Sequence, residues 1–172
     1  MEDLIRRLEE ARVAIAARRA GVERGEPWPL SAAYGTEPES DWGPKEVLAH
    51  SAEMIPFWSS EIEKILAAPV AADPVAFGRV ATDPNRIDRI RRDRALPAAE
   101  LFDRIDAGAI ATGARLTALG PDELARRGLH PRAGEMAIPA IVERFIVVHL
   151  EEHVEQLDGI VARRDSGGSP AA

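Results

Sequence analysis

Apolar side chains recur at steps of three and four residues in four long stretches of this chain, and this period most constrains its fold. In the first stretch, about residues 2–20, the apolar positions are Leu4, Leu8, Ala11 and Ile15. Such spacing is typical of an amphipathic helix, whose apolar stripe must pack against other elements. The other stretches span about residues 44–66, 98–119 and 139–162. Convincing period-two alternation is missing, so the sequence predicts an all-α four-helix bundle.

The connection between the second and third predicted helices is unusually long. About 30 residues separate them, far more than antiparallel neighbours require. Such a link can carry the chain along the whole bundle, which makes these two helices parallel and gives an up-down-down-up path. Within the link, Asp83 and Pro84 predict the start of a short helix that ends near Arg94.

The remaining segments are rich in glycine, proline and small polar residues. Residues 21–41, 67–84 and 129–136 are predicted to be loops, and residues 121–128 a turn or one or two helical turns. Pro56 falls inside the second predicted helix. Its ring displaces the carbonyl four residues earlier, so we expect one bent helix there.

Composition excludes several classes of function. The chain has no cysteine, which rules out disulfides, zinc–thiolate sites and a cysteine nucleophile. Its net charge is −7, and aspartates are interleaved with its one cluster of arginines, Arg86, Arg89, Arg91, Arg92 and Arg94. That pattern is typical of a solvated helix face with local ion pairs rather than of a nucleic-acid interface. We therefore expect no nucleic-acid partner.

Length and hydropathy predict one domain in the cytoplasm. A chain of 172 residues can bury one core, which we place at residues 1–163, with a disordered tail at 164–172 that is rich in glycine and proline. No run of 18 apolar residues occurs, and the first 21 residues are too charged for a signal peptide. We expect no membrane partner.

The four histidines carry the most specific chemical signal. His149 and His153 are spaced i, i+4, so both rings project from one face of the last predicted helix. His50 lies on the inward face of the second predicted helix. The two C-terminal histidines continue the inward line formed by Ile138, Val142 and Phe145.

Three imidazoles from two facing helices suit a first-row divalent ion. Neutral imidazole binds zinc, nickel, copper and iron, and three protein nitrogens leave a position for water or substrate. A lone buried histidine usually just hydrogen-bonds a neighbour, but burying three rings leaves several polar nitrogens to satisfy. We predict that His50, His149 and His153 hold a divalent metal ion, which is zinc, nickel or iron.

The sequence HLEEH also fits H-x-x-E-H, the pattern of inverted zinc proteases. In that interpretation Glu152 is the general base, and a glutamate well downstream is the third ligand. Only 19 residues follow His153, which leaves no room for a remote ligand. In the bundle, Glu151 and Glu152 lie off the histidine stripe and are expected to be solvated.

Three further residues have two interpretations each. His130 precedes Pro131 in a turn-rich segment and is interpreted as a surface residue, with a place at the mouth of the site as the alternative. Trp42 and Trp58 flank His50 in sequence. Packing in the core or at a helix cap is favoured for both, and a wall of the metal pocket is the alternative.

Two segments resemble motifs of the DinB/YfiT-like superfamily. DWGPKEVLAHSAEM is similar to the W-x-x-x-E-x-x-x-H opening of that superfamily's second helix. ELARRGLHPRAGEMAIPAIVERFIVVHLEEHVEQL is similar to its closing segment, a His-Pro loop followed by an H-x-x-x-H helix that ends in Gln-Leu. The resemblance covers the chain to about Arg163.

The resemblance implies a four-helix bundle with an up-down-down-up path. It implies a metal held by three histidines, which correspond to His50, His149 and His153, and it implies a homodimer. Members include transferases and isomerases that use low-molecular-weight thiols, and metal-dependent hydrolase-like proteins. The absence of cysteine is compatible with thiol chemistry, since the thiol would come from the cosubstrate. Pro56 departs from an unbroken second helix.

Two functional hypotheses follow. In the first, the protein is an enzyme whose three-histidine metal ion activates water or a low-molecular-weight thiol toward a small electrophile, for transfer or for hydrolysis. Glu46, one turn before His50, is then a candidate for orienting an imidazole, although a glutamate at a helix N-terminus also interacts with the helix dipole. In the second, the protein is a non-catalytic, dimeric metal- or ligand-binding bundle of the stress-response type. A fourth protein ligand would favour the second hypothesis.

Overall fold

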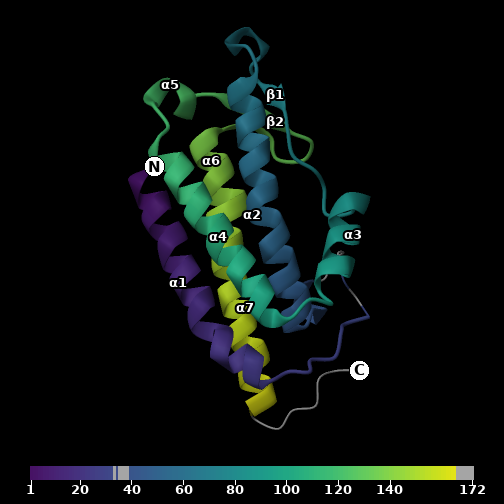
Figure 1. Ribbon diagram of the computed structural model, residues 1–172. Helices are drawn as coiled ribbons and strands as arrows, with labels where there is room; N and C mark the ends of the chain where they lie inside the picture. The colour runs from purple at the N-terminus through teal and green to yellow at the C-terminus, as the bar shows by residue number, and fades with distance from the viewer. Residues whose placement is uncertain (33, 35–38, 166–172) are drawn as a thin grey trace.

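Four helical columns form the body of the molecule (Figure 1). A computed structural model describes residues 1–32, 34 and 39–165. Each of α1 and α2 packs against both α4 and α7, so the four columns surround one core. The columns are α1 (Glu2–Arg24), α2 (Pro44–Ala67), α4 (Ala98–Thr117) and a last column of α6 (Ile138–Val142), the π-helical turn η3 (Glu143–Val147) and α7 (Val148–Asp165).

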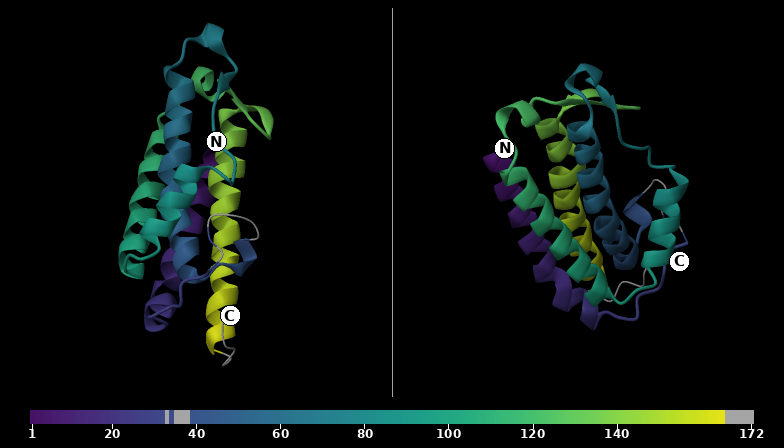
Figure 2. Two further views of the ribbon diagram at one scale, coloured as in Figure 1. Left: turned by 90° about the vertical axis from the view of Figure 1, so that its right-hand side faces the viewer. Right: turned by 45° about the horizontal axis from the view of Figure 1, so that its top comes forward.

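The path of the chain through these columns confirms the predicted up-down-down-up bundle. In the orientation of Figure 1, α1 descends, α2 and α4 ascend, and the last column descends. α2 and α4 are therefore parallel neighbours. The crossover between them contains the 3₁₀ turn η2 (Val70–Ala72) and α3 (Pro84–Asp93), and it returns along the outside of α2, as Figure 2 also shows.

Local sequence explains where α2 and α3 begin. Pro44 and Pro84 occupy the first turns of these helices, where a backbone N–H would have no partner inside the helix. The Asp83 side chain accepts a hydrogen bond from the backbone N–H of Arg86 at 3.0 Å and so caps α3. Pro56 lies inside α2, which continues on both sides of it as one helix.

A small sheet at the upper end of the bundle was not predicted. Its strands are β1 (Val75–Ala76), β2 (Arg127–His130) and β3 (Gly134–Ala137), in the order β1-β2-β3. β1 pairs with β2 in parallel, and β2 pairs with β3 in antiparallel orientation. The prediction of loops at residues 67–84 and 129–136 is wrong at these strands. Strands of two to four residues are too short to show the alternation by which a sequence reveals them.

The last helical column differs from the predicted continuous helix. The π-helical turn η3 (Glu143–Val147) adds a residue to one turn, and this rotates the inward face. Phe145, predicted to face inward, is only partly buried, whereas Ile146, Val147 and Leu150 are fully buried. The predicted stripe is therefore wrong at Phe145, and it misses the buried Ile146, Val147 and Leu150. Just past this turn, α7 presents its two histidines.

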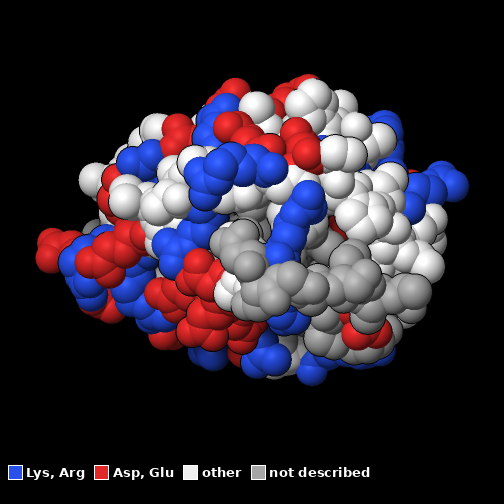
Figure 3. Space-filling view, turned by 90° about the horizontal axis from the view of Figure 1, so that it is seen from below, with Lys and Arg blue, Asp and Glu red and all other residues white. Residues whose placement is uncertain are grey.

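The arginine-rich segment is only partly a solvated face. Arg91 and Arg92 are exposed and pair with neighbouring aspartates, each at 2.7 Å. Arg86 and Arg94 instead point inward and bind glutamates of other elements. The prediction is wrong for these two arginines, because buried carboxylates elsewhere in the fold require a cation. On the lower face drawn in Figure 3, basic and acidic side chains are interspersed.

The first predicted loop and the predicted domain end at slightly different residues in the structure. The first predicted loop contains the end of α1 and the 3₁₀ turn η1 (Glu39–Asp41). α7 continues to Asp165, beyond the predicted domain boundary at residue 163. The predicted disordered tail lies outside the described residues from residue 166 onward. Within the described part of the chain, no helix combines the length and apolarity needed to cross a membrane.

Candidate metal centre

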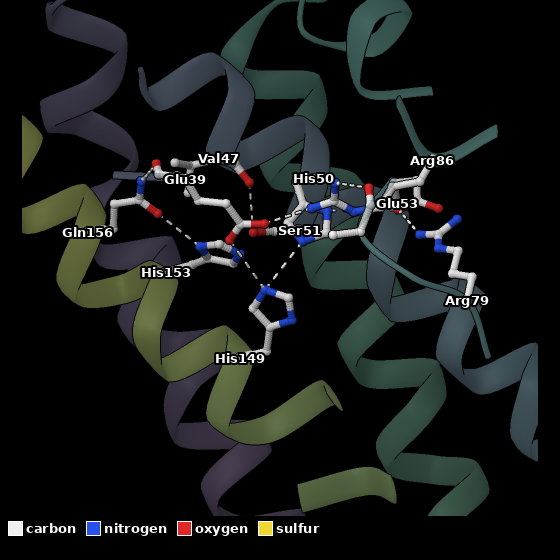
Figure 4. A network of polar contacts seen from close by, with 11 residues as sticks. Glu39, Val47, His50, Ser51, Glu53, Arg79, Arg86, His149, His153 and Gln156 are labelled. Atoms are coloured by element: carbon white, nitrogen blue, oxygen red, sulfur yellow. Dashed lines mark hydrogen bonds and ion pairs between the residues drawn. The ribbon is translucent and has the colours of Figure 1, made fainter. Parts of the chain in front are cut away.

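α2 and α7 bring three histidines together (Figure 4). His50 of α2 faces His149 and His153 of α7, with ring centroids 4.7 to 5.2 Å apart. His50 and His153 are buried, whereas 24% of the His149 side chain is exposed. The structure thus brings together the three histidines that the sequence expects to converge. That they hold a metal stays a prediction.

The facing ring nitrogens of His50 and His149 have a spacing that suits one ion. Their Nε2 atoms are 3.3 Å apart. Two nitrogens bound at about 2.0–2.1 Å to one tetrahedral zinc ion would be about 3.4 Å apart. The two imidazoles therefore need little movement to share a metal ion.

A hydrogen-bond chain fixes the tautomer of His153. The side-chain amide of Gln156 donates to the backbone carbonyl of Glu39 at 2.6 Å, so its oxygen faces the other way. That oxygen lies 3.1 Å from Nδ1 of His153 and accepts its proton. Nε2 of His153 is then unprotonated, and it is buried without a hydrogen-bond partner among the described residues. A buried polar atom without a partner costs about 1–3 kcal/mol, and a cation at this position would remove that cost.

Glu39 is a member of the site that sequence reasoning missed. Ligand atoms of Glu39, His50, His149 and His153 all lie within 4.8 Å of one another. One carboxylate oxygen of Glu39, Oε1, accepts a hydrogen bond from Arg86 at 2.7 Å, and the other, Oε2, lies 3.9 Å from Nε2 of His149. Glu39 belongs to the 3₁₀ turn η1, where no periodic pattern marks it as inward-facing.

The electrostatics of the site favour neutral rings at His50 and His153 beside an ionised carboxylate. Burial, together with the charge of His149, lowers the pKa of His153 to about 4. Burial likewise lowers the pKa of His50 well below its ordinary value. Burial would raise the pKa of Glu39, but its contact with His149 and the nearby positive charges lower it overall. Neutral imidazole is the form that binds metals.

The structure gives Glu46 other partners than an imidazole. Its Oε1 accepts hydrogen bonds from Arg94 at 2.9 Å and from the backbone N–H of Ser31 at 3.0 Å. The carboxylate that approaches His50 is instead that of Glu53, whose Oε2 lies 3.9 Å from Nδ1 of the ring. The role of orienting the imidazole of His50, which the sequence suggested for Glu46, therefore fits Glu53. Glu53 lies one turn after His50, whereas Glu46 lies one turn before it.

The two tryptophans that flank His50 in sequence lie in different places. Trp42 is buried, and its ring meets the ring of His50 edge-on at 5.5 Å between centroids. Trp42 belongs to the hydrophobic core, as expected, and it also borders the histidine cluster. Trp58 stacks on Phe145 at 4.3 Å, next to His130 and away from the cluster, and this is core packing as expected.

His130 is buried and belongs to the sheet, so its interpretation as a surface residue is wrong. Its Nδ1 accepts hydrogen bonds from the backbone N–H groups of Arg132 and Ala133 at 3.2 and 3.0 Å. Its Nε2 donates to the carbonyl of Arg79 at 3.1 Å. Burial lowers the pKa of His130, although the bond to Arg79 opposes this. The ring therefore has a partner at both nitrogens: Nδ1 closes the turn between β2 and β3, and Nε2 ties this turn to Arg79 in the crossover.

The structure contradicts the inverted zinc protease. The third histidine beside His149 and His153 is His50, whereas the protease pattern requires a carboxylate from further along the chain. Glu151 is bound by Arg7 at 2.7 Å, and Glu152 is exposed on the outer face of α7. Neither glutamate lies in a position to act as a base at the cluster.

Comparison with known proteins supports the fold. No family model matches the sequence, and no curated protein is detectably similar to it. The structure is similar to that of YfiT from Bacillus subtilis, described as a probable metal-dependent hydrolase with an unusual four-helix bundle topology. The two share 15% sequence identity at a TM-score of 0.69, over 98% of this chain and 88% of that chain. The likeness shows a DinB/YfiT-like fold.

Proposed function

We propose that the protein is a metal-dependent enzyme in which His50, His149 and His153 bind one divalent ion through their Nε2 atoms. The observation that carries the proposal is the convergence of these imidazoles beside a carboxylate at a place that solvent reaches. The side chains of His149 and Glu39 are 24% and 22% exposed. A small substrate can therefore approach the cluster from this side.

A divalent ion held there would act as a Lewis acid and lower the pKa of a coordinated water or thiol toward neutrality. Glu39 is the proton acceptor in this proposal. Arg86 holds its Oε1, and Oε2 faces the histidines at 3.9 Å from His149. That separation exceeds the spacing of about 3.4 Å between two ligands of a tetrahedral ion, which favours a base beside the metal over a fourth ligand. Oε2 would take the proton of the nucleophile, with Arg86 orienting the carboxylate.

The nucleophile in this proposal is water or a low-molecular-weight thiol, and its target is a small electrophile. The described hydrolase with the same fold supports water. The resemblance to thiol-dependent transferases supports the thiol, which the cosubstrate would have to bring because the chain has no cysteine. Zinc, nickel and iron all accept three imidazoles, so each is a candidate metal.

Metal content tests the proposal directly. We would purify the protein without a polyhistidine tag and measure bound metals by mass spectrometry, beside a His149→Ala/His153→Ala variant. About one ion of zinc, nickel or iron per chain in the wild type, lost in the variant, is expected. If neither protein takes up metal even after incubation with excess ion, the metalloenzyme proposal is wrong.

Activity then tests the role of Glu39. The metal-loaded protein would be screened with activated esters and small electrophiles, with and without low-molecular-weight thiols. We expect Glu39→Gln to retain its metal and to lose about 10²- to 10⁴-fold in turnover, the usual contribution of a general base. Acceleration by thiols would identify the thiol as nucleophile, and turnover without them would identify water.

The alternative is a non-catalytic dimeric bundle in which metal serves stability or ligand binding. The presence of Glu39 within 4.8 Å of the histidine ligand atoms favours it, since a fourth protein ligand would close the coordination shell. In that case Glu39→Gln would weaken metal binding, and no nucleophile would be turned over. Light scattering on the same samples would test the homodimer that we propose with either function.

A further inference from the structure

His50 has one ring nitrogen directed at the histidine cluster and one directed away from it. Nε2 faces Nε2 of His149 at 3.3 Å. Nδ1 is fully buried and, within the described residues, has no hydrogen-bond partner. Metal binding through Nε2 requires the proton of the neutral ring to be on Nδ1, so Nδ1–H needs an acceptor.

Glu53 presents a suitable acceptor one helical turn later. Its side chain is 1% exposed, and its Oε2 lies 3.9 Å from Nδ1 of His50. Its Oε1 is also buried without a partner among the described residues. A buried donor that lacks a partner among the described residues therefore lies beside a carboxylate with acceptor capacity left, and a side-chain shift of about 1 Å would bring Nδ1 and Oε2 to hydrogen-bonding distance.

Arg79 fixes the carboxylate of Glu53 from the opposite side (Figure 4). Its guanidinium donates to Oε2 of Glu53 and stacks on the ring of Phe57 at 3.7 Å. The backbone of Arg79 is held in turn, because its carbonyl accepts the hydrogen bond from His130. A buried carboxylate needs such a cation to stay in place. The sheet thus anchors the arginine that orients Glu53.

The other buried histidine of the cluster already has this arrangement. Nδ1–H of His153 donates to Gln156, and this leaves Nε2 unprotonated toward the cluster. We propose that Glu53 is a positioning residue of the metal centre, whose carboxylate accepts the hydrogen bond of Nδ1–H of His50 and so holds Nε2 unprotonated and directed at His149. The proposal rests on the proposed metal site.

The tautomer of His50 in the metal-free protein tests the proposal without any assay of activity. Long-range proton–nitrogen NMR spectra distinguish a proton on Nδ1 from one on Nε2. His130 is an internal reference, since its Nδ1 accepts two backbone hydrogen bonds and its proton must be on Nε2. We expect the opposite tautomer for His50. A proton on Nε2 of His50 would overturn the proposal.

A matched pair of variants separates positioning from simple burial. Glu46 and Glu53 are both fully buried glutamates of α2, each is paired with one arginine, and each has one oxygen without a partner. Only Glu53 faces His50. We expect Glu53→Gln to weaken zinc binding about 10- to 100-fold, as loss of such a partner does, and Glu46→Gln to change it less than about threefold.

Competition with a chromophoric zinc chelator would measure both affinities, and urea unfolding would confirm that both variants fold. Equal losses of affinity in the two variants, or no loss in Glu53→Gln, would contradict the proposal. If the wild-type protein itself bound no metal, the proposed function would fail, and the tautomer of His50 would still decide the role of Glu53.

Discussion

The chain has four histidines, and the hydrogen bonds of His130 at the sheet differ from those of the three histidines in the cluster. Every nitrogen of His130 has a partner from the backbone. His50 and His153 each retain one buried nitrogen that no described group satisfies. A protein that needs a buried ring only for packing satisfies its polar atoms. The unsatisfied Nε2 of His153, which faces the cluster, therefore indicates a ligand there, whereas the satisfied nitrogens of His130 serve the architecture of the sheet.

The side chains that surround His130 also differ from those that surround the cluster. His130 lies against aromatic rings, with centroids of Trp58, Phe77 and Phe145 at 6.0, 5.5 and 4.9 Å. The cluster is instead bordered by charged side chains, among which Glu39 and Arg86 form an ion pair at 2.7 Å. Buried charges cost stability unless they are paired. The charged region is thus the one that the fold maintains at a cost.

The largest effect should come from removing a cluster histidine. His153→Ala deletes one of three predicted ligands, so we expect zinc affinity to fall about a thousandfold, or about 4 kcal/mol. Chelator competition would measure it. Glu46→Gln is the control and should bind zinc within about threefold of the wild type. If His153→Ala bound zinc as tightly as the wild type, metal binding would not distinguish the cluster from the sheet end.

The metal-free protein should lose stability in acid because of the cluster. His153 has a folded pKa of about 4 against an ordinary value of 6.5. Between these values the unfolded chain binds a proton that the folded chain does not. Stability is therefore fully present above about pH 6.5 and falls as the pH drops toward 4, by about 3 kcal/mol.

Urea unfolding in the presence of a chelator, from pH 7.5 to pH 4, would measure this loss. His153→Gln should flatten the dependence of the unfolding free energy on pH, because glutamine does not titrate. An unchanged slope in this variant would show that other groups cause the acid sensitivity.

A smaller effect is expected at the sheet end. His130→Ala removes three hydrogen bonds, two of them from the turn between β2 and β3. Water can reach part of this turn and replace some of them, so we expect a loss of about 2 kcal/mol in unfolding free energy. The values to compare are the unfolding free energies of the metal-free wild type and of metal-free His130→Ala, both at pH 7.5. A loss of zinc affinity in the same variant would pass through Arg79, whose carbonyl accepts the hydrogen bond from His130 and whose guanidinium binds Glu53.

The smallest effect concerns the two tryptophans. Trp42 touches His50, whereas Trp58 packs against His130. We expect nickel or cobalt to quench part of the tryptophan emission in the wild type and in Trp58→Phe, but not in Trp42→Phe. Loss of the edge contact in Trp42→Phe should weaken metal binding only about twofold, or about 0.5 kcal/mol. Quenching that survives in Trp42→Phe would argue against metal at this cluster.

The sequence predicted the helices and the convergence of the histidines because both depend on local spacing. The long apolar periods define α1, α2 and α4 within a few residues. The sheet could not be predicted, since β1 pairs with residues of β2 more than fifty positions away, such as Val75 with Gly128. A pairing between such short and distant segments has no local signal.

The polar partners of the histidines were harder to predict, for a different reason. Glu46 and Glu53 stand about one turn to either side of His50, and nothing in the sequence distinguishes them. Which glutamate faces His50 depends on Arg94 and Arg79. These arginines approach from separate parts of the crossover and bind one glutamate each. Glu39 lies in a 3₁₀ turn of three residues, where its direction depends on Arg86 and Gln156 rather than on any period.

The π-helical turn η3 has a consequence for how this chain tolerates insertions and deletions. A π turn is an α-helix with one residue too many. Deleting a single residue between Glu143 and Val147 would therefore give a more regular helix. Because the wide turn already absorbs the extra residue, the helix on either side would keep its phase, and His149 and His153 would still face His50. Converting η3 to α-helix without a deletion would instead rotate everything that follows by about 100° relative to what precedes it, and the two histidines would swing away from His50. The π turn thus keeps α7 in phase with α6, and the chain can change length within Glu143–Val147 without losing the site only where the width of the turn changes with it.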